Sequence, residues 1–136
     1  MADLASLQGA LAVEHSAVFG YGIVGGRLGP EDLLASESYD VHRQRRDLLT
    51  AALVEASATP TPAAPAYEPD SPVVTAAQAR ALAAQIEAGA AVAYAQLVAT
   101  GDEPWRRTAA AWLRDSAVRA YRWSGEVPAL PGLPSA

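Results

Sequence analysis

Apolar residues recur every three or four positions along four long stretches of the chain, the spacing of one face of an α-helix. The first of these stripes consists of Leu4, Leu7, Leu11, Glu14, Val18 and Tyr21. Glu14 is the residue of this stripe that carries a charge at neutral pH. Because an unpaired carboxylate is costly to bury, the pattern predicts that Glu14 meets a cation, a metal ion or a proton inside the protein.

Capping residues and helix breakers divide the sequence into four expected helices. Gly25 and Gly26, with Gly29 and Pro30, are expected to end the first helix, Thr75 to cap the third, and Gly125 to follow the fourth. The expected helices span about residues 3–24, 30–56, 75–99 and 103–123. This pattern predicts an all-α fold in a single domain, residues 1–136.

The connections between the expected helices differ greatly in length. Short connections make an antiparallel hairpin of the first two helices and another of the last two. The connection 57–74 carries five Pro, and at about 3.1 Å per residue it can reach about 55 Å, more than the ~36 Å of a 24-residue helix. We therefore expect it to cross the full length of a bundle. The Pro-containing tail, about 124–136, is expected to lie on the surface through Val127, Leu130 and Leu133.

Composition narrows the function classes. Ala makes up about one residue in four, which favours closely packed helices. The net charge of −5 disfavours nucleic acid and anionic membranes as partners. All ten basic residues are Arg, and Cys is absent, so lysine and cysteine chemistry is excluded. No uninterrupted apolar run reaches membrane-spanning length and no leader peptide is evident, so a cytoplasmic protein is expected.

The other three expected helices also carry polar residues on or near their apolar stripes. A single such residue is commonly a core histidine or a glutamate at the edge of a helix, but recurrence on all four helices favours one shared buried cluster. Its expected members are Glu14, Tyr39, His42, Glu87, Ser116 and Arg119. We expect Arg43, Arg45 and Arg46 to lie on a solvated face with nearby aspartates.

Five segments are distinctive: LQGALAVEHSAVFGYGIVGGRL, HRQRRDLL, APAYEP, IEAGAAVAYAQLVA and the closing RAYRWSG with PGLP. Together they resemble a bacterial family of unknown function, the DUF4439 type, within the ferritin-like four-helix bundles. The resemblance covers nearly the whole chain and implies a ferritin-like bundle with a long Pro-rich crossover. It implies no particular activity.

Ferritin-like di-iron proteins take a Glu from each of two helices and a Glu-x-x-His from each of the others. The resemblance places Glu14, His42 and Glu87 at three of these six positions. Tyr39 stands where a Glu is required, and Ser116 and Arg119 replace the second motif. Arg cannot ligate a metal, so we expect Arg119, with His42, to act as counter-charge for the two glutamates.

Three functions follow from this interpretation. The leading one is a non-catalytic, metal-free scaffold or binding domain, expected to be a homodimer, with no cofactor and an unknown small-molecule ligand. The alternative is a reduced iron or manganese site of Glu14, His42 and Glu87 with oxidase-like or iron-handling chemistry. A third is binding of a small anion or carboxylate ligand at Arg119. A pocket near Glu14, His42 and Arg119 would be the first place to search for a ligand. We expect Trp105, Trp112 and Trp123 to form core or an oligomer interface, or alternatively an apolar pocket for a flat ligand.

Overall fold

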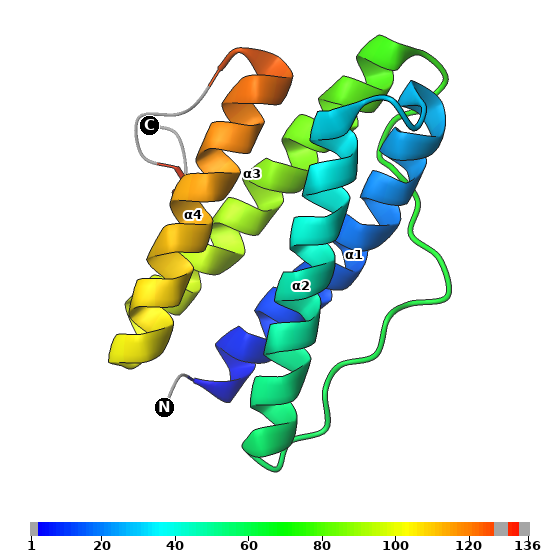
Figure 1. Cartoon of the computed structure of the whole chain (residues 1–136). Helices are drawn as coiled ribbons and strands as arrows, with labels where there is room; N and C mark the ends of the chain where they lie inside the picture. Colours follow the sequence, from blue (N-terminus) through cyan, green and yellow to red (C-terminus); the bar gives the residue numbers. More distant parts are fainter. Residues whose placement is uncertain (1–2, 127–130, 134–136) are drawn as a thin grey trace.

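Four long helices account for most of the computed structural model, which describes residues 3–126 and 131–133 (Figure 1). The helices are α1 (Leu4–Leu28), α2 (Leu33–Glu55), α3 (Ala76–Thr100) and α4 (Glu103–Ser124). Each begins at a residue whose side-chain oxygen accepts a hydrogen bond from a backbone N–H of the first turn. These N-cap residues are Asp3, Asp32, Thr75 and Asp102.

Helix α1 is longer than predicted. It continues through Gly25 and Gly26 and ends at Gly29, whose φ of 94° is a conformation that favours glycine. Thr75 caps α3 as expected and forms a reciprocal pair with Gln78, which stabilises the first turn.

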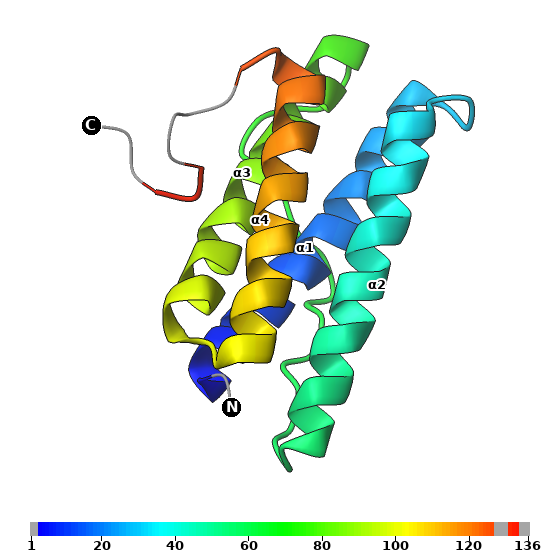
Figure 2. The ribbon, with the colours of Figure 1, turned by 60° about the vertical axis from the view of Figure 1, so that its left-hand side comes forward.

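The chain path confirms the all-α four-helix bundle. In Figure 1, α1 and α2 form one antiparallel hairpin, and α3 and α4 form the other. The segment between α2 and α3 runs back along the whole length of the bundle, so these two helices point the same way. Helix α1 packs against both α2 and α3, and α3 packs against α4. Helices α2 and α4 face each other at a greater separation (Figure 2).

Side chains of α1 hold the long connector in place. The amide of Gln8 donates to the carbonyl of Thr59 (2.8 Å) and accepts from the backbone N–H of Thr61 (2.8 Å). About two turns further along α1, Nε2 of His15 donates to the carbonyl of Thr61 (2.9 Å). The ring of Phe19 then packs on Tyr67, with ring centroids 5.5 Å apart. These contacts at intervals along one face of α1 make the connector part of the folded structure.

The core is divided into two apolar clusters separated by charged residues. One cluster contains Leu7, Ala10, Leu11, Leu49, Leu53, Ala93, Leu97 and Ala109. The other contains Tyr21, Val24, Ala35, Ala79, Ala83 and Trp123. Glu14, His42 and Glu87 lie along the chain between the members of these clusters and are completely buried. The charged residues are therefore enclosed by apolar packing.

Helix α3 is long and apolar enough to cross a membrane by length and composition alone, with a window of mean hydropathy 1.3. Gln85 and Glu87 interrupt the apolar run in α3, which is why a search for uninterrupted runs predicts no such segment. The core helix of a soluble protein meets the same criterion, and α3 supplies Glu87 and Tyr94 to the interior.

The described part of the tail approaches α3 closely. Gly132 has a φ of 81°, and a side chain there would meet the carbonyl oxygen of Ala91 at 2.5 Å. Leu133 is 53% exposed, so it contributes little burial. Val127 and Leu130, which were also expected to lie on the bundle, are outside the described residues.

Candidate functional site

His42 lies between two buried glutamates near the middle of the bundle. Its Nδ1 is 2.6 Å from Oε2 of Glu14 on α1, and its Nε2 is 3.0 Å from Oε2 of Glu87 on α3. Both ring nitrogens therefore face carboxylate oxygens, and both donate when the imidazole is protonated. All three side chains are fully buried, where such charge-assisted hydrogen bonds are strongest.

Two tyrosines donate further hydrogen bonds to the carboxylates of Glu14 and Glu87. The hydroxyl of Tyr21 donates to Oε2 of Glu87, and the hydroxyl of Tyr94 donates to Oε1 of Glu14. The indole N–H of Trp123 in turn donates to the Tyr21 oxygen (3.1 Å). Burial and the nearby carboxylates raise the pKa of both tyrosines well above the ordinary value. The two hydroxyls therefore stay protonated and act as donors.

The same geometry fixes the charge of His42. Burial by itself lowers the pKa of an imidazole, but the hydrogen bonds and charges of Glu14 and Glu87 outweigh it and raise the pKa of His42 to about 9. His42 is therefore an imidazolium at neutral pH, shared by the two carboxylates.

A second group of charges joins α2 to α4. Arg45 donates through Nη2 to Oδ2 of Asp115 (2.6 Å) and through Nη1 to the hydroxyl of Tyr94 (3.1 Å). Arg119 donates through Nε to the same Asp115 oxygen (2.9 Å) and through Nη1 to Ser38 (3.0 Å). Burial opposes ionisation of Asp115, but the two guanidinium groups hold its pKa below the usual range. Tyr94 links this group to Glu14.

The structure brings together most of the residues that the sequence indicated, with two corrections. Glu14, His42, Glu87 and Ser116 are fully buried in one network. Tyr39 lies outside this network. Its side chain is half-buried, and the Cζ atom of Arg43 lies over its ring, 5.4 Å from the ring centroid. Arg119 is part of the network, but the expectation that it neutralises the glutamates is wrong, because its partners are on α2 and α4.

Five members of the network were not predicted from the sequence. They are Tyr21, Ser38, Arg45, Tyr94 and Asp115. Arg45 was expected on a solvated face with Arg43 and Arg46, yet only 5% of it is exposed. Arg43 and Arg46 do pair locally, with Asp40 and Asp47.

The residues of this site do not fit a metal ion. The imidazole of His42 separates Glu14 from Glu87, so the three side chains do not converge on one point. Among the described residues, no group of three or more His, Asp or Glu is arranged to hold a metal. The guanidinium groups of Arg45 and Arg119 lie between α2 and α4, and a guanidinium group cannot act as a metal ligand.

Two surface grooves lie away from the network, on either side of the Phe19–Tyr67 contact. The first, of about 290 Å³, lies between α1, α3 and the connector; the second, of about 460 Å³, lies between α1, α2 and the connector. Neither groove is lined by Glu14, His42 or Arg119, so both lie away from the place where a ligand pocket would first be sought. Neither groove is lined by a Trp.

Two of the three tryptophans, Trp112 and Trp123, pack on tyrosines of the network, and Trp105 packs on Trp112. The rings of Trp105 and Trp112 meet edge to face, with centroids 6.0 Å apart, and Trp112 packs in the same way on Tyr94. Trp123 contacts Tyr21. These residues thus supply core packing and one hydrogen bond.

Comparison with known proteins agrees with this fold. The crystal structure of a conserved hypothetical protein, rv2844, from Mycobacterium tuberculosis is similar, with a TM-score of 0.84 and 36% sequence identity over 89% of this chain and 93% of that chain. No curated protein matches the chain. The family model described as "Domain of unknown function (DUF4439)" matches residues 6–135. The resemblance to the DUF4439 type is thereby confirmed, and the chain belongs to the DUF4439 family.

Proposed function

We propose that this chain is a non-catalytic, metal-free scaffold or binding domain, built on a ferritin-like plan. The observation that carries the proposal is the position of His42, whose two ring nitrogens each face a carboxylate at 3.0 Å or less. A protonated imidazole supplies in this position the positive charge that a metal ion would otherwise supply to Glu14 and Glu87. Charge compensation of the interior is thus provided by the protein itself.

The burial of the network supports a structural role over catalysis. Glu14, His42 and Glu87 are fully buried, and none of them lines either groove. In the described part of the chain, every buried side-chain nitrogen or oxygen has a hydrogen-bond partner. A catalytic acid or base must reach the proton it transfers, and here the candidate groups contact only each other and the helices around them.

Metal analysis tests this proposal. The protein is purified from medium supplemented with iron and manganese, dialysed, and measured by elemental mass spectrometry. We expect far less than one metal ion per chain, both in the native protein and in Glu87→Gln. About one ion per chain, lost in Glu87→Gln and retained in the surface variant Glu103→Gln, would refute the metal-free proposal in favour of the iron or manganese alternative.

The geometry does not favour the third alternative, anion binding at Arg119. Two of its guanidinium nitrogens already donate to Asp115 and Ser38, and the side chain is only 11% exposed. An incoming anion would have to displace the Asp115 carboxylate.

We also propose that the chain assembles as a homodimer. Large apolar side chains are exposed on α3 and α4, with Val92 49%, Val118 58% and Tyr121 56% exposed. Contact between copies would cover such side chains. Light scattering coupled to size-exclusion chromatography gives the mass directly, and a monomeric mass at micromolar concentration would refute the dimer.

A further inference from the structure

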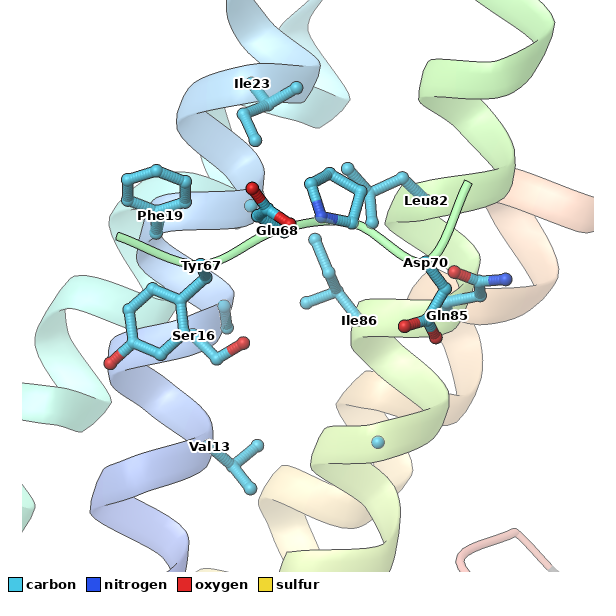
Figure 3. Close-up of a pocket in the computed structure, with 14 residues that line it drawn as sticks. Val13, Ser16, Phe19, Ile23, Tyr67, Glu68, Asp70, Leu82, Gln85 and Ile86 are labelled. Atoms are coloured by element: carbon cyan, nitrogen blue, oxygen red, sulfur yellow. The ribbon is translucent and has the colours of Figure 1, made fainter. Parts of the chain in front are cut away.

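The groove between α1, α3 and the connector has an apolar floor. Gly20 of α1 is buried and has no side chain, so Ile86 of α3 fits directly against the backbone of α1. A Cβ on Gly20 would be only 2.6 Å from Cδ1 of Ile86. Val13, Ile23 and Leu82 extend this apolar surface along the groove. Figure 3 shows their side chains on the two facing helices, with the connector crossing between them.

The polar part of the groove comes mainly from the connector and is acidic. Glu68 and Asp70 line the groove where the connector passes from α1 to α3 (Figure 3). Both are exposed and have no hydrogen-bond or ion-pair partner within the described residues. No Arg or His is among the groove's described lining residues, so nothing there compensates the two negative charges.

The neighbouring groove has the opposite character. It shares Phe19, Ile23 and Tyr67 with the first groove, but its ionisable lining residues include His15 and Arg46. Arg46 is paired with Asp47, and His15 is bonded to the connector. The acidic groove is therefore the one of the two with unpaired charge over an apolar surface.

We propose that this acidic groove binds a small organic cation, an ammonium group attached to an apolar body. The apolar body would lie on Ile86 and Leu82, and the ammonium would be attracted to Glu68 and Asp70. The volume, about 290 Å³, is at the small end of the usual range for ligand sites, about 300–1,000 Å³. This inference deepens the binding-domain part of the proposed function. It shares no residue with the buried network, so its failure and the failure of the metal-free proposal are separate results.

Three probes of equal chain length separate charge from apolarity. Binding of n-octylammonium, octan-1-ol and octanoate to the full chain is measured by titration calorimetry and by backbone amide shifts in NMR spectra. We expect octylammonium to bind at least tenfold more tightly than octanol, octanoate to bind most weakly, and the amide signals of Gly20 and Gly89 to shift. Equal affinity for octylammonium and octanol would overturn the proposal.

A charge-matched pair of double variants tests the role of the acidic residues. Glu68→Gln with Asp70→Asn removes two negative charges at the groove; Glu31→Gln with Glu55→Gln removes two elsewhere. We expect the first pair to weaken octylammonium binding about tenfold, as two exposed ion pairs would, and the second to leave it unchanged. Equal weakening in both pairs would show attraction to net charge alone and would refute the site.

Two glycines allow a matched steric test. Gly89 lines the acidic groove and Gly22 lines the neighbouring one, and at both a Cβ would meet no atom within 4 Å. Both glycines are exposed, so we expect each helix to tolerate Leu at these positions. We expect Gly89→Leu to abolish octylammonium binding and Gly22→Leu to leave it intact. Retained binding in Gly89→Leu, with native circular dichroism, would place the ligand elsewhere and overturn the proposal.

Discussion

The charge on His42 makes the stability of this protein depend on pH in a direction that the structure determines. The pKa of His42 is about 9 in the folded chain, against 6.5 for an unperturbed histidine. A raised pKa means that the folded state holds the proton more tightly than the unfolded state does. The stabilisation is therefore complete below pH 6.5 and is lost as the pH rises through about 9.

The size of the effect follows from the difference between these two values. Each pH unit between 6.5 and about 9 reduces the free energy of unfolding by at most about 1.4 kcal/mol, giving a total of about 3 kcal/mol. Urea denaturation followed by circular dichroism, at constant ionic strength and at pH values from 6 to 9, measures it directly. The absence of Lys and Cys from the sequence leaves few other groups that titrate in this range.

His42→Gln is the control, because it removes the titrating group and keeps hydrogen-bonding capacity. Its free energy of unfolding should change much less over the same range, while His15 is present in both proteins. Should the variant fail to fold, the imidazole NMR signals of the native protein still report the midpoint. A native free energy of unfolding that is constant within 1 kcal/mol from pH 6 to 9, or a midpoint near 6.5, would refute the assignment of an imidazolium.

Two further predictions use matched pairs of variants and urea denaturation. Arg45→Met should reduce the free energy of unfolding by about 2 kcal/mol. This is below the roughly 3–5 kcal/mol typical of a broken buried ion pair, because the acidic partner Asp115 is partly exposed. The control Arg43→Met, at an exposed position, should change the free energy of unfolding by less than about 0.5 kcal/mol, and equal effects of the two variants would contradict the burial of Arg45. Gly22→Ala, where a Cβ meets open space, should stabilise by about 0.5–1 kcal/mol, and Gly20→Ala should lose that gain by displacing Ile86; a larger gain at Gly20 would contradict the close packing there.

The sequence predicts the helices and the topology well, because both depend on local signals. The spacing of apolar residues, the N-cap Thr75 and the length of the Pro-rich connector are all visible in one dimension. The predicted end of α1 at Gly25 and Gly26 was wrong. Each glycine inside a helix costs only about 1 kcal/mol relative to Ala, which is too little to end a helix that packs well on both sides. The helix ends instead at Gly29, the second of the two expected stop signals, where the backbone adopts a positive φ.

The buried network could be predicted only in part. Glu14, His42 and Glu87 stand out because each interrupts an apolar stripe. On α2, however, residues three and four positions from His42 fit the helical period equally well. The sequence pattern predicts Tyr39 on the inner face and Arg45 on the solvated one, but the helix is rotated so that Ser38 and Arg45 point inward. The partner that decides this, Asp115, is 70 residues away in sequence, beyond the reach of any local pattern.

The shared carboxylate of Asp115 also constrains how this sequence can vary. One aspartate serves Arg45 from the first hairpin and Arg119 from its own helix. Replacing the aspartate alone would leave two guanidinium groups competing for neutral partners, and replacing either arginine alone would leave a weakened pair. Related chains should therefore keep or lose these three residues as a set.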